Sequence, residues 1–410
     1  MTILELQTKR KIVLLGYGKE GQSTERFLQA HAPQAEIVIA DQARDAEYLS
    51  LQTTGDLVIK TPGIPKHLVT VPYTTATNIF FANVKKPIVG VTGSKGKSTT
   101  SSLIAAMLQA AGKRVRLIGN IGTPALDVFD EDALTDVYVM ELSSYQLDDL
   151  ERGPEIAVFT SFFPEHLDYH GSLEAYLGAK ANIVRKGNKD QLFVYNAQYP
   201  ELQELVAEAP GRALPFTEEV PFSLEALRLR GTHNVQNVCG AWTVAEQLGV
   251  TARQAEEAIQ SFEPLPHRLT EVGTYRGITF VDDAIATAPE ATIQALQSVP
   301  KVETLFLGGT DRGYAFDELA KMIDVSSVRN IVVFPDTGEK IKAALLRHSR
   351  RSFVLCETES MEEAVRFAYA HTSAGMTCLL STASPSYRLW KNFEHKGEEF
   401  VKWVKEFGKE

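Results

Sequence analysis

Short apolar runs alternate with stretches of helical periodicity along the chain. The runs have the length and continuous hydrophobicity of strands buried in a parallel sheet. They lie at residues 11–15, 36–40, 57–60, 87–91, 115–118, 136–140 and 156–160 and, in the last third of the chain, near 279–281, 304–307, 331–334, 353–355 and 377–380. Between the runs, apolar residues recur at helical spacing, as they do in residues 103–108. The alternation predicts an α/β fold with mostly parallel sheets.

Two breaks divide this pattern, and the 410 residues exceed what one core accommodates. The first break is at Lys85-Lys86-Pro87, and the second is the proline-rich segment 262–266. We therefore expect three domains. A Rossmann-like domain is predicted over residues 1–86, a P-loop domain with a mostly parallel sheet over 87–264, and a second Rossmann-like domain over 265–410.

Composition and charge narrow the class of protein. The hydrophobic share of 44% and charged share of 23% are those of a globular protein, and a net charge of −10 argues against nucleic acid as a partner. No apolar run reaches membrane-spanning length, and the first residues lack the apolar core of a signal peptide. Three scattered cysteines resemble buried thiols of a reducing compartment. We expect a cytoplasmic protein that does not insert into membranes.

The most informative motif is a glycine-rich turn between a strand and a helix. It reads Thr-Gly-Ser-Lys-Gly-Lys-Ser-Thr over residues 92–99, so that Gly93, Ser94, Lys95, Gly96, Lys97, Ser98 and Thr99 form the turn and the first helical residues. Backbone N–H groups of such a turn and the helix N-terminus bind phosphate. Lys97 is placed to reach the terminal phosphates and Ser98 to hold Mg²⁺. A glycine-rich turn without ligand is the alternative, but the context predicts a nucleoside triphosphate site.

A second glycine motif opens the chain. Gly-x-Gly-x-x-Gly at residues 16–21 follows the first strand, and Asp41 ends the second. This arrangement is typical of dinucleotide binding and, taken alone, suggests NAD. Any nucleotide diphosphate suits the same geometry, and a UDP-type ligand is at least as plausible because the triphosphate site lies in the next domain. The rigid turn at 61–65 is another place for a diphosphate.

Three further residues in the central domain are candidates for metal binding. Glu141 ends a strand predicted to lie beside the P-loop strand, where a Mg²⁺ ligand belongs, although it could instead cap a helix. His166 follows a strand and is flanked by Glu165 and Asp168, which favours a metal ligand over a core histidine. Lys180 lies near the apolar face of a predicted helix. It could extend to solvent or be covalently modified.

Other polar residues gather at predicted strand and helix ends. Asn234 and Asn237 are helical neighbours that could face one nucleotide. His267 and Arg268 follow the proline-rich segment directly. In the last domain the loops that begin at Asp282-Asp283, 308–312 and 381–387 follow parallel strands and are expected at one sheet edge.

Together these motifs resemble the Mur ligase family of cell-wall peptide ligases, over nearly the whole chain. Within the family the chain is most similar to the branch that adds glutamate to UDP-N-acetylmuramoyl-L-alanine. The resemblance is carried by residues 92–99, Gly119-Asn-Ile-Gly, Glu141-Leu-Ser-Ser-Tyr-Gln-Leu, Tyr176-Leu-Gly-Ala-Lys, His233-Asn-Val-Gln-Asn, Leu265-Pro-His-Arg and Lys391-Asn-Phe-Glu-His-Lys-Gly-Glu-Glu-Phe.

The resemblance implies a role for each matching position. It implies that ATP is bound by the glycine-rich turn with Lys97, Asn237, Arg268 and Asp283. One Mg²⁺ would be bound by Ser98 and Glu141, and a second by His166 and an N-carboxylated Lys180. The muramoyl substrate would be bound by Asn120, Ser143 and Gln146, and glutamate by Thr287, Arg312, Ser386, Tyr387 and Phe393. Lys97, His166, Lys180 and Arg268 would be catalytic. The first domain would bind the UDP substrate, and the third would bind glutamate and close on ATP. The family also implies a monomer.

One departure bears on the acceptor. After the strand near 279–281 the glutamate-adding branch usually has a lysine, where this chain has Ile285 within Asp-Ala-Ile-Ala-Thr-Ala-Pro-Glu. Arg312 stands where a second lysine is usual. This pattern resembles a divergent branch that adds L-glutamate. D-glutamate, the common substrate, is the narrow preference and L-glutamate the alternative. A folylpolyglutamate-synthase-like ligase and an inactive ATP-binding regulatory protein are further alternatives.

Overall fold

The structure is a computed structural model that describes residues 1–225, 227, 232–263, 265–385 and 388–409; for 167, 168 and 232 it describes the backbone only. The chain forms two compact units. The first comprises residues 1–227 and 233–262, and the second consists mainly of residues 263–410. Each unit is α/β, with three sheets in all, which confirms the predicted fold class. Within the described ranges, no helix is both long and apolar enough to cross a membrane.

The first sheet contains four parallel strands in the order β2-β1-β3-β4. Its elements are α1 (Ile3–Leu6), β1 (Lys11–Leu15), α2 (Lys19–His31), β2 (Glu36–Ala40), η1 (Tyr48–Thr54), β3 (Leu57–Lys60), η2 (Lys66–Leu68), β4 (Tyr73–Thr74) and α3 (Ala76–Asn83). Leu15 pairs with both Ala40 and Lys60, so the first three strands end at one edge. The two predicted turns, residues 16–21 and 61–65, therefore begin side by side.

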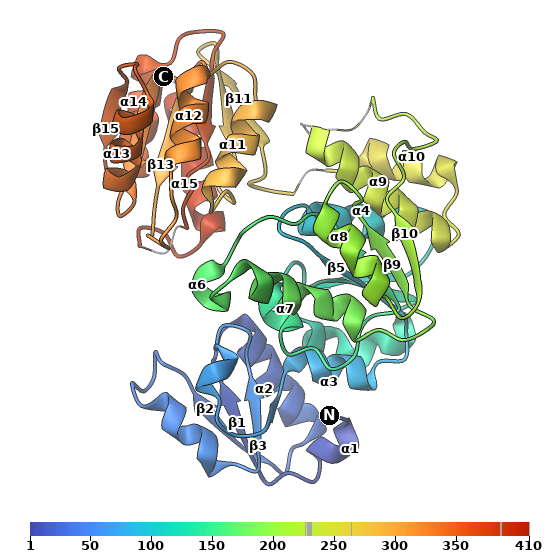
Figure 1. Ribbon diagram of the computed structural model, residues 1–410. Coiled ribbons are helices and arrows are strands. Elements are labelled where there is room, and N and C mark those ends of the chain that lie inside the picture. The colour runs from blue at the N-terminus through green and yellow to red at the C-terminus, as the bar shows by residue number, and fades with distance from the viewer. Residues whose placement is uncertain (226, 228–231, 264, 386–387, 410) are drawn as a thin grey trace. The chain divides into compact units, whose positions relative to one another are not determined.

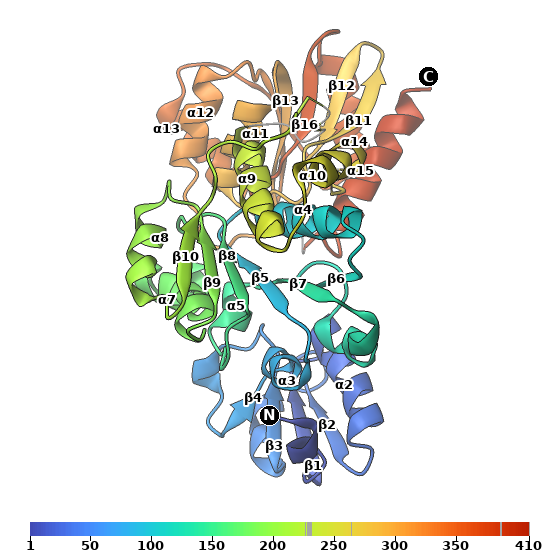
Figure 2. The same cartoon turned by 90° about the vertical axis from the view of Figure 1, so that its right-hand side faces the viewer.

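The second sheet, in the same unit, has six parallel strands in the order β10-β9-β8-β5-β7-β6. Its strands are β5 (Ile88–Thr92), β6 (Val115–Gly119), β7 (Val137–Glu141), β8 (Ile156–Phe159), β9 (Leu192–Tyr195) and β10 (Arg212–Pro215). Its helices are α4 (Lys97–Ala110), η3 (Ala125–Leu134), α5 (Ser144–Leu147), α6 (Leu167–His170), α7 (Leu173–Arg185), α8 (Pro200–Glu204), η4 (Leu205–Glu208), α9 (Thr232–Gln247) and α10 (Ala252–Ser261). Figure 2 shows these strands side by side with α4 along one face.

One hydrophobic cluster joins the two sheets of the first unit. It runs from the buried side chains of β1 and α2 through α3 to β7 and the helices beyond. The ring of Phe80 on α3 meets that of Tyr138 on β7 edge-on, with 5.1 Å between centroids. Because α3 packs against both sheets, it holds the glycine turn of β1 close to the elements that follow β7 (Figure 2).

The second unit contains a six-stranded sheet in the order β11-β12-β16-β13-β14-β15, drawn in yellow to red in Figure 1. Its elements are β11 (Thr270–Tyr275), β12 (Ile278–Asp282), α11 (Pro289–Ser298), β13 (Val302–Gly308), α12 (Asp317–Val325), β14 (Asn330–Phe334), α13 (Gly338–His348), β15 (Val354–Glu357), α14 (Met361–His371), β16 (Thr377–Leu380) and α15 (Phe393–Phe407). β11 is antiparallel to β12, whereas the other strands are parallel. One core lies under α11–α13 and the other under α14 and α15.

Candidate nucleotide and metal site

The glycine-rich turn adopts a conformation that only glycine allows at two positions. Gly93 has φ +149° and Gly96 has φ +83°. A Cβ on Gly93 would lie 2.1 Å from Oγ1 of Thr160, and one on Gly96 would lie 2.4 Å from Oδ1 of Asn237. The turn is therefore packed against β8 and α9 from behind, and α4 begins directly after it. The 14-residue helix has no side-chain cap at its N-terminus, where helices of phosphate-binding loops bind anions, whereas the N–H groups of Ser94 and Lys95 are bonded to Ser161.

The side chains of the turn hold its shape. The ammonium of Lys97 donates to the carbonyl oxygens of Gly93 (2.8 Å) and Ser94 (2.9 Å), so it lies over the turn. Ser94 donates through Oγ to the Phe163 carbonyl oxygen, and Lys95 forms an ion pair with Glu165 at 2.7 Å. Ser98 and Thr99 are buried in the first turn of α4. The predicted phosphate-binding residues thus form the turn after β5 and the first turn of α4.

Glu141 has the environment of a cation ligand. It ends β7 in register with Val91 of the P-loop strand, and only 1% of it is exposed. Oε1 accepts a hydrogen bond from Nδ2 of Asn120 (2.8 Å), whereas Oε2 is buried and has no hydrogen-bond partner among the described residues. A buried carboxylate oxygen without a donor fits a hard divalent cation. The helix-capping alternative does not apply, because Ser143 caps α5.

His166 is held in a strained but defined orientation. Its φ is +53°, which is unusual for a residue other than glycine, and its Nδ1 lies 2.8 Å from the hydroxyl of Tyr145. Burial lowers the pKa of His166 to about 4; the negative charge of Glu165 raises it and the positive charge of Lys97 lowers it further. The imidazole is therefore neutral at physiological pH, the form in which histidine binds metal.

Lys180 does not extend to solvent. It lies on α7 with 1% exposed, and its Nζ donates to the carbonyl oxygen of Gly93 (2.8 Å). Burial, followed by the positive charge of Lys97, lowers the pKa of Lys180 well below its ordinary value. A neutral amine is the form that reacts with carbon dioxide. The local surroundings thus favour the modification alternative over an extended lysine.

Asn237 lies directly behind the turn. Its Oδ1 accepts a hydrogen bond from Thr100 Oγ1 (3.3 Å), and its Nδ2 donates to Oδ1 of Asn234 (2.9 Å). The two asparagines therefore act as a pair, as their helical spacing predicts. Both are more than 90% buried.

Among the residues that the structure describes, no group of three or more His, Cys, Asp or Glu side chains is arranged to hold a metal ion. The two predicted Mg²⁺ sites do not require such a group, because each includes another ligand type: the hydroxyl of Ser98 in one and a carboxylated Lys180 in the other. The side chain of Asp168 is not described. The observation that fits Mg²⁺ is the buried Oε2 of Glu141, which has no hydrogen-bond partner among the described residues.

The two diphosphate candidates in the first sheet line a single cleft of about 600 Å³. Residues 16–21 form one wall and 61–64 another, together with 41–43 and Tyr48. Both oxygens of Asp41 accept backbone N–H groups, from Tyr17 (2.6 Å) and Ala43 (2.9 Å). The Asp41 carboxylate therefore joins the turn of residues 16–21 to the loop after β2.

The predicted muramoyl-binding residues lie between this cleft and Glu141. Ser143 and Gln146 form a capping box at the start of α5, and Nε2 of Gln146 donates to Oε2 of Glu20 at 3.1 Å. Asn120 is exposed and bonds Glu141. Asn120 is therefore bonded to Glu141, and Gln146 is bonded to Glu20 in the glycine turn after β1, while Ser143 is bonded to Gln146.

In the second unit, predicted residues and their neighbours lie together at the ends of β12 and β16. Asp283 is 6% exposed and accepts hydrogen bonds from Ser381 Oγ (2.8 Å) and the Leu269 N–H (3.3 Å). Burial raises its pKa to about 7, while these hydrogen bonds and Arg268 oppose the shift. His267 contacts Asp282 at 2.6 Å, and its ring lies 6.2 Å from that of Phe393.

The remaining predicted residues of this unit are on separate loops. Thr287 follows β12 and Arg312 follows β13, and both are partly exposed. Ser386 and Tyr387 lie outside the described residues.

Two residues of interest were missed by the sequence reasoning. Tyr145, which lies in the same motif as Glu141, Ser143 and Gln146, contacts His166. Lys396 is a fully buried lysine that donates to Thr382 Oγ1. Burial lowers the pKa of Lys396 to about 7. Its helical spacing with Phe400 and Val404 was the available signal, since all three lie on the buried face of α15.

Comparisons with known proteins agree with this geometry. The family description "Mur ligase middle domain" matches residues 91–226, and "Mur ligase, glutamate ligase domain" matches 267–384. The chain belongs to the Mur ligase family. It is accordingly an ATP-dependent amide-forming ligase.

Individual relatives cover almost all of the chain. The UDP-N-acetylmuramoyl-L-alanine--L-glutamate ligase of Salinispora tropica is 35% identical over 97% of this chain and 98% of its own. The UDP-N-acetylmuramoylalanine--D-glutamate ligase of Leuconostoc citreum is 34% identical over 89% of this chain and 85% of its own. The crystal structure of MurF ligase from Thermotoga maritima in complex with ADP has a TM-score of 0.65 at 17% identity and covers 98% of this chain and 99% of that chain. That last similarity concerns the fold.

Proposed function

We propose that this ligase joins glutamate to UDP-N-acetylmuramoyl-L-alanine at the expense of ATP, a step of peptidoglycan precursor synthesis. The observation that carries the proposal is the glycine-rich turn beneath Lys97, with the unpaired oxygen of Glu141 and the buried amine of Lys180, whose pKa is lowered, beside it. The glutamate assignment is supported by the family description of residues 267–384 and by the names of the relatives.

The chemistry requires activation of a carboxylate, because an amine does not displace oxygen from an anionic carboxylate. A carboxylate oxygen of the substrate attacks the γ-phosphorus of ATP, the bond to the β-phosphate oxygen breaks, and ADP leaves. The glutamate amine then attacks the acyl carbon of the resulting acyl phosphate and loses a proton as phosphate departs. Lys97 and the N–H groups of the turn would stabilise the transferring phosphoryl group.

Ser98 and Glu141 would hold one Mg²⁺, and His166 with a carboxylated Lys180 would hold a second. Bound Mg²⁺ supplies Lewis-acid stabilisation of phosphoryl oxygens. The uncharged amine of Lys180 would attack carbon dioxide, forming an N–C bond and releasing one proton, which converts the side chain into an anionic oxygen ligand. Asn237 is proposed to contact the adenine. The roles of Arg268 and Asp283 at ATP rest on the family resemblance.

The cleft at residues 16–21 and 61–64 would take the UDP moiety, with Asn120, Ser143 and Gln146 at the muramoyl group. Thr287, Arg312, Ser386, Tyr387 and Phe393 are proposed for glutamate. The domain limits 1–86, 87–264 and 265–410 remain our prediction.

We propose L-glutamate as the acceptor and keep D-glutamate, the narrow preference from the sequence, as the alternative. Support comes from Ile285 in place of a lysine and from two L-glutamate ligases among the relatives, the Salinispora enzyme at 35% identity and one from a Micromonospora strain at 34%. The D-glutamate alternative is supported by the Leuconostoc relative at 34%.

ADP release tests both parts of the proposal. We expect turnover with UDP-N-acetylmuramoyl-L-alanine and L-glutamate to exceed that with D-glutamate at least tenfold. The reverse preference would establish the D-glutamate alternative. ADP release at background with both enantiomers would contradict the proposed function and favour an inactive ATP-binding protein.

A further inference from the structure

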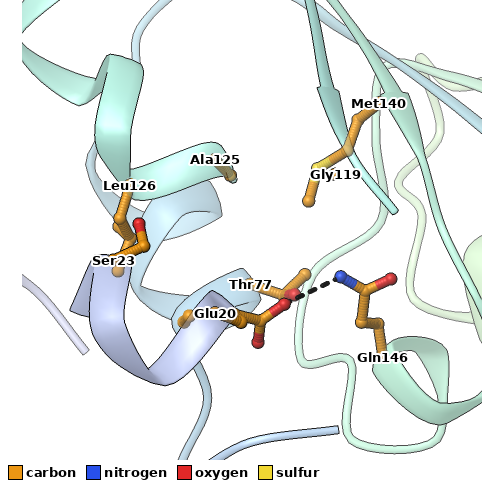
Figure 3. Close-up of a pocket in the computed structure, with 9 residues that line it drawn as sticks. Glu20, Ser23, Thr77, Gly119, Ala125, Leu126, Met140 and Gln146 are labelled. Carbon is orange, nitrogen blue, oxygen red and sulfur yellow. Dashed lines mark hydrogen bonds between the residues drawn. The ribbon is translucent and has the colours of Figure 1, made fainter. Parts of the chain in front are cut away.

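A small cavity lies where the two sheets of the first unit meet. Its volume is about 10 Å³, in which one water molecule fits. Glu20 and Ser23 of α2 and Thr77 of α3 line it from one side, and Gly119 and Gln146 from the other (Figure 3). Figure 3 shows Glu20 and Gln146 facing each other, joined by the hydrogen bond from Nε2 of Gln146 to Oε2 of Glu20.

Two polar atoms at this cavity are unsatisfied. Oε1 of Glu20 and Oγ of Ser23 are both buried and have no hydrogen-bond partner among the described residues. Gln146 faces Glu20 with its amide nitrogen, because its own Oε1 accepts from the N–H and hydroxyl of Ser143, and its Nε2 donates to Oε2 of Glu20. One water between Glu20 and Ser23 would satisfy both atoms. A protonated carboxyl would donate to that water, whereas an ionised one would leave a buried charge.

The surrounding charges do little to stabilise an ionised Glu20. Lys60 is the cation that acts on it, and this lysine already pairs with Asp149 at 2.7 Å. The acids of the elements packed around the cavity do not stabilise a further negative charge: Asp127 pairs with Arg26, Asp130 with His31 and Glu131 with Arg116, while Asp132 and Glu141 accept from the neutral N–H groups of Lys85 and Asn120. The sequences of α3 and α5 contain no charged residue. Burial accordingly raises the pKa of Glu20 to about 7, with Gln146 and Lys60 opposing.

Glu20 also belongs to the cleft. It lies between Gly18 and Gly21 in the turn after β1 and lines the 600 Å³ cleft as well as the cavity. Its carboxyl therefore connects the glycine turn to α5, which begins three residues after Glu141. A negative charge at this point would repel an anionic ligand of the cleft, and a neutral carboxyl would not.

We propose that Glu20 is a positioning residue of the nucleotide-sugar cleft. In its protonated form Glu20 bonds an internal water shared with Ser23 and accepts a hydrogen bond from Gln146, and it thereby holds the glycine turn ready for a diphosphate. This role rests on the proposed function, since it assigns a diphosphate ligand to the cleft. It follows that the ligand binds the protonated protein more tightly, so binding takes up a proton wherever free Glu20 is ionised.

Calorimetric titration of the whole protein with UDP-N-acetylmuramoyl-L-alanine tests this between pH 6 and 8.5. The ligand's phosphates and carboxyl are ionised throughout that range. We expect the affinity to fall above pH 7, approaching tenfold per pH unit, and proton uptake approaching one in paired buffers of different ionisation enthalpy. Glu20→Gln should bind at pH 6 within about threefold of wild type and lose the pH dependence. Glu36→Gln, at an exposed position of β2, should show the affinity and pH dependence of the wild type.

Two results would overturn the proposal: wild-type affinity that does not change with pH, or Glu20→Gln with the wild-type profile. The first needs no variant, so a folding defect in Glu20→Gln leaves the test intact. Failure of the precursor to bind even wild type at pH 6 would instead remove the proposed function. Binding with a flat profile would remove only the role of Glu20.

Discussion

At the scale of single residues, the site is defined by side chains whose burial sets their chemical state. Burial close to the glycine-rich turn lowers the pKa of both Lys180 and His166, and Glu141 retains a buried oxygen without a donor. Each of these is costly in a protein that binds nothing there. The three side chains together favour a site in which cations and phosphate complete the missing interactions.

Lys180→Ala tests the proposed carbamate. We expect turnover to fall at least a hundredfold in an ADP-release assay, because the variant loses an anionic oxygen ligand, and added bicarbonate should not restore it. The wild type should also show a carbamate signal in ¹³C NMR after exposure to labelled carbon dioxide. Lys186→Ala, an exposed lysine at the end of the same helix, serves as the control and should keep wild-type turnover. Unimpaired turnover in Lys180→Ala would exclude the carbamate from the mechanism.

At the scale of elements, the turn between β5 and α4 depends on close approach as well as on backbone conformation. Gly96 and Gly112 flank α4 and have similar positive φ values, +83° and +78°. A Cβ on Gly96 would collide with Asn237, whereas one on Gly112 would meet no atom within 4 Å. The two glycines therefore separate the cost of conformation from that of packing.

Gly112→Ala should cost about 1 kcal/mol of unfolding free energy and leave the affinity for ATP unchanged. Gly96→Ala should cost about 3 kcal/mol, because overpacking adds to the conformational penalty, and should abolish ATP binding. Chemical denaturation and ATP titration measure the two effects. Equal ATP affinity in both variants would contradict the assignment of the turn to phosphate.

Much of this arrangement could be predicted from the sequence, because continuous apolar runs and glycine motifs are local signals. β5, β7 and α4 follow the expected ranges closely, and the glycine-rich turn lies between β5 and α4. β11 was missed because it is a half-exposed antiparallel edge strand whose polar residues interrupt any apolar run. β9 and β10 were missed too, and β10 is likewise exposed.

The candidate residues could be named from the sequence, but their environment could not. The burial of Lys180 and the contact of Gln146 with Glu20 depend on tertiary packing between distant segments. Likewise, the motif after β1 did not show that Asp41 accepts the backbone N–H groups of Tyr17 and Ala43.

At the scale of the whole molecule, the first unit is held together by more than its shared hydrophobic cluster. Nζ of Lys60, at the end of β3, pairs with Asp149 at 2.7 Å, and both side chains are at most 5% exposed. Asp149 also accepts from the hydroxyl of Tyr73. A second pair, Lys66 with Asp148, lies close by in the sequence, but Lys66 is half exposed.

Lys60→Met should destabilise the first unit by about 3–5 kcal/mol, because it leaves the Asp149 carboxylate buried without its partner. Lys66→Met should cost at most about 1 kcal/mol, since an exposed ion pair contributes little. Calorimetry should place the loss in one unfolding transition and leave a transition of residues 263–410 unchanged. Similar costs for the two variants would contradict the structural role given to the buried pair.

The central claim, that ATP activates a carboxylate for capture by glutamate, is tested most directly by following oxygen. UDP-N-acetylmuramoyl-L-alanine labelled with ¹⁸O in its carboxyl group is incubated with ATP and glutamate, and the released phosphate is analysed by mass spectrometry. Transfer through an acyl phosphate predicts one ¹⁸O atom in each phosphate from fully labelled substrate, with the amide retaining the other. Unlabelled phosphate accompanying ADP release would contradict the account.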